Sequence, residues 1–299
     1  MAKKNNSFDI SAISNNATYT DYLNRVKKLA TARFKWSNVP DSWNTNFLEQ
    51  TLYYYGMCGA LYDEQYGHML TKTTINGKLN IYNMPIKLNC YGIYYNKTKY
   101  VYNGLDNTGK KDCVVLIQND PEMIPTRYTV ELFCRRLYEI ERTIDVNLKQ
   151  QKTPSLILCD QKQRLTLLNL YMQYDGNQPF IFGDKLILGN QNPIQAIDTK
   201  APFLLDKLTA HKQSVWNELL TFLGVNNVNF EKKERLITEE ANANNQFINL
   251  NIMNEYKCRK EACKQINDYF GLNVDVEFNT DIINMKNVEK IVSEVEKDE

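Results

Sequence analysis

The sequence predicts an α+β fold, and three observations support this prediction. Two segments, residues 129–149 and 203–224, carry apolar side chains every three or four positions, which is the period of an amphipathic α-helix. A third segment, residues 67–117, consists of short runs rich in Tyr, Val and Ile that are separated by Asn-Gly and Asp-Asn turns. Separate helical and strand-rich stretches of this kind are typical of an α+β chain.

Composition limits the possible classes of function. The chain has 299 residues, of which 43% are hydrophobic and 24% are charged, which is enough to build a core. The 36 Lys and Arg residues nearly balance the 35 Asp and Glu residues, so any contact with a polyanion must be local. The 7 Cys form no C-x-x-C pair and are predicted to be reduced thiols, mostly small core residues.

Neither a membrane segment nor a metal centre is expected. The start "MAKKNNSFDI" has no apolar targeting region, and no run approaches the roughly 18 apolar residues of a membrane span. We therefore expect a soluble protein that is made where it works. The only two histidines, His68 and His211, are far apart in sequence and are predicted to be ordinary polar or half-buried residues.

The N-terminal third begins with an Asn-rich and Ser-rich arm, residues 1–18, and continues with two predicted helices. The first starts near Tyr19 behind a cap at Thr20 or Asp21 and carries its apolar residues at near-helical spacing. Those residues are Tyr22, Val26, Leu29 and Phe34. The stretch "SNVPDSW" ends this helix, and "NTNFLEQTLYYYG" is predicted to form the second.

Residues 67–117 are predicted to form a small antiparallel β unit, and one motif inside it resembles a phosphate-binding loop. "GLDNTGKK", Gly104 to Lys111, matches G-x-x-x-x-G-K, but Lys111 stands where a Ser or Thr would bind magnesium. A phosphate-binding loop also needs a following helix, whereas "DCVVLIQ" is predicted to be a strand. A hairpin turn is therefore the favoured interpretation of this motif.

The middle of the chain contains the clearest helix, residues 129–149, which would span roughly 30 Å. Residues 154–202, bounded by two prolines, are predicted to form a compact α/β insertion of strand, turn, short helix and strand. A second long helix follows, and Gly224 is its predicted C-terminal cap.

A polar segment, "FEKKERLITEEANANNQF" (residues 230–247), separates this helix from the C-terminal region. So polar a connection is expected to lie on a surface or line a cavity, because a buried one would leave backbone groups unpaired. Glu239 and Glu240 inside it are predicted to be solvated rather than catalytic, because neighbouring side chains point apart. A helix through "NEYKCRKEACKQINDYFG", the strand "LNVDVEF" and a charged tail follow.

Three segments of the sequence carry a resemblance to a known family. They are "ELFCRRLYEIERTIDVNLKQQKTP", "APFLLDKLTAHKQSVWNELLTFLGVNNVNFEKKERLITEE" and "RKEACKQINDYFGLNVDVEF". Together they resemble the portal protein, also called the upper collar or head-tail connector, of small podoviruses with protein-primed genomes. The agreement is dense over residues 129–153 and 198–240, fair over 258–278 and thin over 67–117.

The resemblance implies a portal-type fold assembled as a ring of twelve identical subunits at one capsid vertex, through which double-stranded DNA is packaged and ejected. It divides the chain into an N-terminal arm, a wing, two stem helices that form the channel wall, a clip, and a channel loop. The implied ranges are 1–18 for the arm, 19–128 and 247–299 for the wing, 129–152 and 203–224 for the stem helices, 153–202 for the clip and 225–246 for the loop.

The resemblance also implies which residues meet DNA. The loop would offer mixed charge to the duplex through Lys232, Lys233 and Arg235 beside Glu231 and Glu234. Lys207 falls at a family position that faces the channel, and Lys200 stands near the clip end. Lys3 and Lys4 are the only basic residues of the arm. A closed ring would repeat each such lysine in every subunit, which makes a belt of positive charge.

The implied partners are other copies of the chain, double-stranded DNA, the major capsid protein, a scaffolding protein, the packaging ATPase and the lower collar or tail protein. No catalysis, cofactor, metal or membrane contact is expected, and the protein would belong to the virion after assembly in the host cytoplasm. Two other classes stay open at this point: a nucleic-acid-processing enzyme built around "GLDNTGKK", and a passive structural protein of the capsid or tail.

Overall fold

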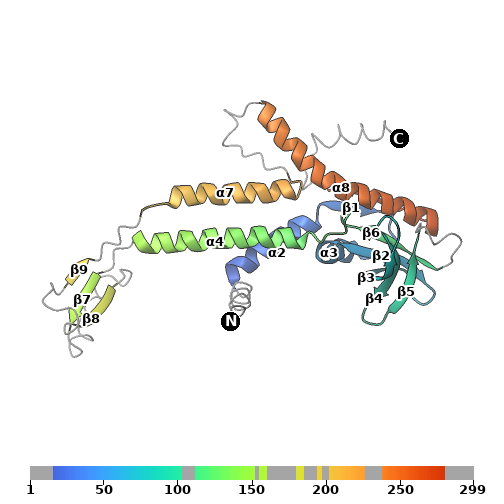
Figure 1. Cartoon of the computed structure of the whole chain (residues 1–299), viewed down its shortest axis with the longest axis horizontal. Helices are drawn as coiled ribbons and strands as arrows, with labels where there is room; N and C mark the ends of the chain where they lie inside the picture. Colours follow the sequence, from blue (N-terminus) through green and yellow to red (C-terminus); the bar gives the residue numbers. More distant parts are fainter. Residues whose placement is uncertain are drawn as a thin grey trace. The chain divides into compact units, whose positions relative to one another are not determined.

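The computed structural model describes residues 16–102, 112–151, 155–159, 180–184, 194–196, 202–225 and 238–279. Side chains are not described for the three short strand segments between 155 and 196 or for residues 238–251. The chain divides into two compact units, one comprising Met1–Arg135 and Val215–Glu299 and the other Arg136–Ser214. Helices and strands occur in both, so the predicted α+β class is confirmed (Figure 1).

The first helix, α2 (Ala17–Thr31), begins earlier than predicted. Its N-cap is Asn16, whose side chain accepts a hydrogen bond from the backbone N–H of Thr18, so the predicted cap at Thr20 or Asp21 is wrong. An Asn oxygen satisfies one of the helix's unpaired N–H groups equally well. The predicted apolar stripe is also too long, because Phe34 lies in a strand, β1 (Phe34–Ser37). There Phe34 and Trp36 are buried at a spacing of two residues.

Helix α3 (Thr45–Tyr55) confirms the second predicted helix and ends at Gly56. Gly56 adopts a φ of 75°, and a Cβ atom there would collide with the carbonyl group of Met123. Only glycine satisfies both constraints. The tight turn leads directly into the first strand of the β unit.

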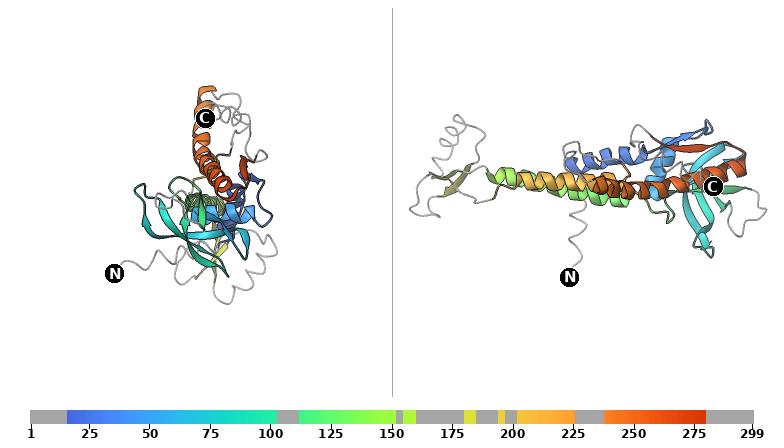
Figure 2. Two further views of the ribbon diagram at one scale, coloured as in Figure 1. Left: turned by 90° about the vertical axis from the view of Figure 1, so that its right-hand side faces the viewer. Right: turned by 90° about the horizontal axis from the view of Figure 1, so that it is seen from above.

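That β unit is a closed five-stranded barrel (Figures 1 and 2). Its strands are β2 (Met57–Asp63), β3 (Gly67–Leu79), β4 (Pro85–Tyr91), β5 (Asn96–Val101) and β6 (Cys113–Gln118). The prediction of an antiparallel unit over residues 67–117 missed β2, whose sequence "MCGALYD" is rich in small residues. All neighbouring strands pair antiparallel except β5 and β6, which pair parallel. Motif "GLDNTGKK" lies outside the described residues, but the segment after it is the strand β6, as predicted.

A hydrophobic core lies between the barrel and the C-terminal helix α8 (Thr238–Phe270). Buried residues of α3, β2, β6 and α8 contact one another there, including Leu48, Leu52, Cys58, Ile117 and Ile266. Strand β10 (Asp275–Phe278) follows α8 and pairs antiparallel with β1. The predicted helix and strand at this end of the chain are therefore confirmed.

Helix α8 starts earlier than the sequence predicts. Residues 238–246, which we assigned to the channel loop of 225–246, belong to its first turns. The acidic pair Glu239–Glu240 falls in the first turn by sequence position, where negative charge favours a helix. Residues 226–237, which include the basic part of the predicted loop, lie outside the described residues.

The long helices are α4 (Arg127–Gln151) and α7 (Leu205–Phe222). The predicted helices over 129–149 and 203–224 match them closely. Residues 136–214 also hold a three-stranded sheet with order β8-β7-β9, made of β7 (Ser155–Cys159), β8 (Phe180–Asp184) and β9 (Ile194–Ala196). Strand β7 pairs parallel with β8 and antiparallel with β9. The predicted short helix of this insertion falls outside the described residues.

Six cysteines of the described part are free, and five of them are buried, as the sequence predicted. Burial raises the pKa of Cys90 to about 11 and that of Cys134 and Cys263 to about 12. Because only the thiolate is nucleophilic, we expect these buried thiols to react roughly 100-fold more slowly with a disulfide reagent at pH 8 than a free thiol does. Colorimetric thiol titration checks this. Protein unfolded in guanidinium chloride serves as the control and should react fully at once.

Candidate nucleic-acid interface

The paired helices α4 and α7 are the described elements to which the sequence assigned DNA contact. They lie side by side (Figures 1 and 2). Near the barrel, Phe133 and Phe222 have ring centroids 6.3 Å apart, and Val215 and Leu219 are buried. Trp216 of α7 contacts Tyr22 of α2 at 6.3 Å between ring centroids. The apolar period of α7 is thus used for packing, which leaves its other face to polar residues.

Within residues 136–214, polar groups join the same two helices. The buried side chain of Asn147 donates to the carbonyl oxygen of Pro202 at 2.9 Å and accepts from the N–H of Leu204 at 3.2 Å. This amide holds the segment that precedes α7 against the last turns of α4. Midway along, Lys212 forms an ion pair with Glu141. Both contacts fix the register between the two helices.

Lys207 is the one predicted contact residue that the structure describes, and it is exposed on α7 next to Asp206. The other exposed residues of α4 and α7 carry both signs of charge, among them Arg135, Glu139, Arg142 and Asp145. His211 is exposed, and His68 is half-buried between the rings of Tyr62 and Phe270. Neither histidine belongs to a cluster of metal-ligating side chains in the described part of the chain.

The remaining predicted contacts lie outside the described residues. They are Lys3, Lys4, Lys200, Glu231, Lys232, Lys233, Glu234 and Arg235. The structure does describe both flanks of the segment 226–237, which end at Val225 and begin again at Thr238. How these flanks are anchored therefore determines where the segment must start and end.

The first anchor is a buried ion pair that sequence reasoning missed. Arg33, 2% exposed, donates to both carboxylate oxygens of Glu255 on α8 at 3.2 and 2.7 Å. The same guanidinium donates to the carbonyl oxygen of Leu223, just after α7, at 3.1 Å. One side chain thus ties the end of α7 to α8. Arg33 and Glu255 are so far apart in sequence that no local pattern could have paired them.

The second anchor is Gly224, which the sequence predicted as the cap of α7. Its φ is 73°, and two hydrogen bonds close the helix: Gly224 N–H to the oxygen of Thr221 at 3.1 Å, and Val225 N–H to the oxygen of Leu220 at 2.9 Å. This is the glycine-dependent Schellman motif. A Cβ atom at Gly224 would also stand 2.6 Å from the Cβ of Ile252 on α8.

We expect Gly224→Ala to lower the free energy of unfolding by about 1–3 kcal/mol, because it adds backbone strain and a steric clash. Denaturant unfolding followed by tryptophan fluorescence measures this. Gly92→Ala is the matched control, since Gly92 has no positive φ and open space around its Cβ position, and it should change stability by about 0.5 kcal/mol or less. Equal effects of the two substitutions would contradict the assigned cap.

A second buried ion pair completes the network. Arg259 of α8, 1% exposed, donates to both oxygens of Glu49 on α3 at 3.0 and 2.9 Å, and Trp36 donates to the same carboxylate at 2.8 Å. Burial opposes the charge, but the carboxylates of Glu49 and Glu255 more than offset it and raise the pKa of Arg259. Helix α8 is thereby joined to α3, β1 and the end of α7 through charged groups.

No helix among the described residues is long and apolar enough to cross a membrane. In a comparison with protein families, the family described as Phage Connector (GP10) matches residues 4–283. Among solved structures, the chain is similar to one described as the portal and tail of native bacteriophage P68. That match has 16% identity and a TM-score of 0.48, and it covers 98% of this chain and 99% of the other.

Proposed function

Because the chain belongs to the phage connector family and is a head-tail connector, or portal, protein, we propose that it works as a ring of twelve subunits at one capsid vertex. The match over residues 4–283 is the observation that carries this proposal. Double-stranded DNA would pass through the ring during packaging and ejection. Helices α4 and α7 would be the stem, residues 153–202 the clip, and the barrel with α8 the wing.

Exposed apolar side chains on α4 support the proposed oligomer. Tyr128 and Leu132 are 60% and 58% exposed, and Val146 and Leu148 are also exposed. Large apolar groups concentrated on one helix indicate a protein contact that a single chain leaves uncovered. A closed ring would cover them with neighbouring copies, because each subunit then has a neighbour on both sides.

The mixed charge of the stem helices supports a channel through which DNA moves. On α7, Asp206 stands beside Lys207, and on α4 the exposed arginines alternate with Glu139 and Asp145. A wall of uniform positive charge would hold phosphates tightly. Balanced charge instead permits many weak contacts, which suits a sliding duplex. In this proposal Lys207 and the segment with Lys232, Lys233 and Arg235 supply the positive contacts.

We assign the chain no catalysis, because the family to which it belongs is a structural one. The energy for DNA movement would come from a separate packaging ATPase. The other proposed partners are the major capsid protein, a scaffolding protein and the lower collar or tail protein. Lys3 and Lys4 would give the N-terminal arm a weak role in docking the packaging motor, and Lys200 stands near the proposed clip end. Assembly would take place in the host cytoplasm before incorporation into the virion.

Negative-stain electron microscopy of the full-length protein tests the assembly. We expect class averages that show twelvefold rings with a central hole wide enough for a duplex. The rings should bind double-stranded DNA without sequence preference and with strong salt sensitivity. Monomers or small compact oligomers under several salt conditions would contradict the proposal, and nucleotide hydrolysis by the purified chain would favour the enzyme alternative.

A further inference from the structure

The barrel closes between β5 and β6 through a short ladder, which leaves an opening beside the first half of β5 in the described part of the chain. These strands share only two residue pairs, Tyr100↔Cys113 and Val101↔Val114. The first half of β5, Asn96–Lys99, pairs with β4 on one side and has no strand partner on the other within the described chain. On the far side of the opening, β2 pairs with β6 only as far as Leu61↔Val114. Among the residues that the structure describes, this strand edge beside the mouth of the barrel therefore has no partner.

The hydrogen-bond pattern shows which backbone groups of β5 face this opening. The N–H of Gly92 donates to the oxygen of Tyr95 at 2.7 Å, which makes these two residues a hydrogen-bonded pair of the β4–β5 hairpin. Antiparallel strands alternate hydrogen-bonded and non-hydrogen-bonded pairs. Residues 97 and 99 therefore bond to β4, whereas Asn96 and Thr98 direct their N–H and C=O groups to the open side.

The opposite wall of the opening is held apart by side chains. If the β2–β6 ladder continued, its next pair would be Tyr62 and Cys113. Instead, Cys113 N–H donates to the hydroxyl of Tyr269 at 2.8 Å, and the carbonyl of Tyr62 accepts from the ammonium of Lys99 at 3.3 Å. Two side chains thus satisfy the backbone groups that would have continued the β2–β6 ladder.

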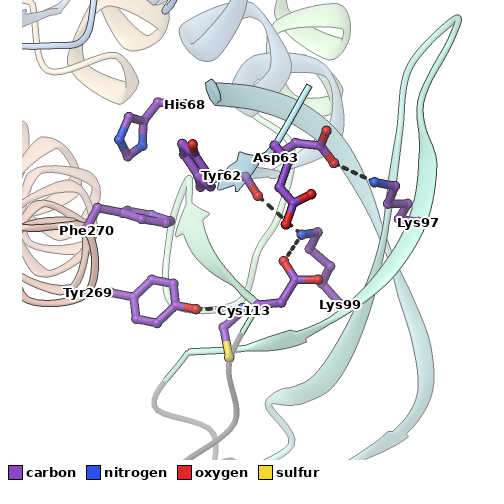
Figure 3. A pocket seen from close by; sticks show the side chains of 10 residues that line it. Tyr62, Asp63, His68, Lys97, Lys99, Cys113, Tyr269 and Phe270 are labelled. Carbon is purple, nitrogen blue, oxygen red and sulfur yellow. Dashed lines mark hydrogen bonds and ion pairs between the residues drawn. The ribbon is translucent and has the colours of Figure 1, made fainter. Parts of the chain in front are cut away.

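A cavity of about 800 Å³ occupies the opening, and Figure 3 shows its two walls. One wall is aromatic: Tyr62 and His68 have ring centroids 5.1 Å apart, His68 and Phe270 5.3 Å, and Tyr269 and Phe270 4.7 Å. The other wall carries charge, with Lys97 paired to Asp63 at 2.6 Å and Lys99 paired to Asp112. Strands present successive side chains to opposite faces, so an added strand would direct only alternate side chains to the aromatic wall.

In the described part of the chain, one polar group of the cavity has no hydrogen-bond partner and another has no ion-pair partner. The Nδ1 atom of His68 is buried without a hydrogen-bond partner. The carboxylate of Glu64 is exposed at the rim and has no ion pair there, while both lysines of the cavity are paired with aspartates. The cavity therefore carries a net negative charge, which favours a basic group over an anion.

We propose that this opening receives an extended peptide segment of a partner protein, which adds as a strand along Asn96–Lys99. Its backbone bonds to the N–H and C=O groups of Asn96 and Thr98. Alternate side chains lie against the aromatic wall and are apolar, and at least one of the others is Arg or Lys, facing Glu64. In such strand addition, main-chain hydrogen bonds supply affinity, and the pockets that receive alternate side chains supply specificity.

A peptide-display selection on the full-length protein tests this inference. Twelve-residue random peptides serve as the probe, and enriched sequences are synthesised with a fluorophore for polarisation measurements. We expect enrichment of alternating apolar residues with one basic residue. Thr98→Pro removes the outward N–H without breaking the β4 ladder and should weaken binding at least roughly ten-fold. Thr98→Val is the matched control, because it also loses the hydroxyl contacts to Asn76 and Asn89, and it should bind as the parent does.

A second variant tests the charge argument: Glu64→Gln should weaken peptides with Arg or Lys and leave uncharged analogues unchanged. Three results would overturn the inference. The first is that no peptide is enriched, and the second is that Thr98→Pro binds as well as Thr98→Val while both unfold at the parent's temperature. The third is slow amide hydrogen exchange at Thr98 in the free protein, which would mean that the edge is already covered by the chain itself.

Discussion

Replacing Arg259 by methionine is expected to lower the free energy of unfolding by about 3–5 kcal/mol, because the substitution leaves a buried carboxylate without its counter-ion. Arg259 supplies two of the three hydrogen bonds that Glu49 accepts, and only the 2.8 Å bond from Trp36 would remain. The same guanidinium also donates to the carbonyl oxygens of Asn119 and Glu255 at 3.2 and 3.1 Å. Glu49, Asn119 and Glu255 therefore lose contacts at once.

Unfolding of the full-length protein in guanidinium chloride measures this effect. The protein concentration is held fixed, because assembly contributes to the apparent stability. Arg25→Met is the control. Arg25 pairs with Asp21 at 2.7 Å, but both side chains are more than half exposed, so its loss should cost about 0.5 kcal/mol or less. A double variant, Arg259→Met with Glu49→Met, should be less destabilised than Arg259→Met alone, because no unpaired charge is left. If the double variant were worse than the sum of the singles, this account would be wrong.

The contrast between Arg259 and the helices shows which features local sequence patterns can predict. The period of α4 and α7 follows from a few residues along one segment, so both helices were predictable to within a few positions. Arg259 and Glu49 meet across 210 residues, and nothing near either residue indicates the pair. Strand β2 was missed for another reason. Its Cys, Gly and Ala fit a buried strand between two layers but give no alternating pattern.

In the candidate site, too, local features were predictable from the sequence, whereas features that depend on distant residues were not. Gly224 was predicted because a helix period followed by glycine is a local signal, and its positive φ confirms it. The extent of the polar segment after it was overestimated. "TEEANANN" contains no apolar period, yet it forms the first turns of α8. Packing of residues further along that helix stabilises these turns. The open edge at Thr98 depends on where β6 pairs, which is a property of the whole barrel and not of any short stretch.

The double substitution Lys232→Ala with Lys233→Ala is expected to impair DNA packaging and retention while rings still form. Both lysines belong to the segment between the cap at Gly224 and the first residue of α8, Thr238. The buried network that holds these flanks contains neither lysine, so folding and assembly should not depend on them. In the proposed ring each substitution is repeated in every subunit, and the positive belt around the duplex is lost.

Filter binding of double-stranded DNA to assembled rings over a salt series measures the effect. We expect affinity at low salt to fall at least roughly ten-fold and the slope of log K against log salt to become shallower by at least about 1. The matched control is Lys35→Ala with Lys257→Ala, which removes the same number of charges from exposed positions on β1 and α8. Because those positions lie on the proposed wing, their loss should leave the salt slope unchanged. Loss of rings in the Lys232 and Lys233 variant would instead place these lysines at a subunit contact. An equal change of the salt slope in both variants would mean that DNA binding depends only on the net charge of the ring.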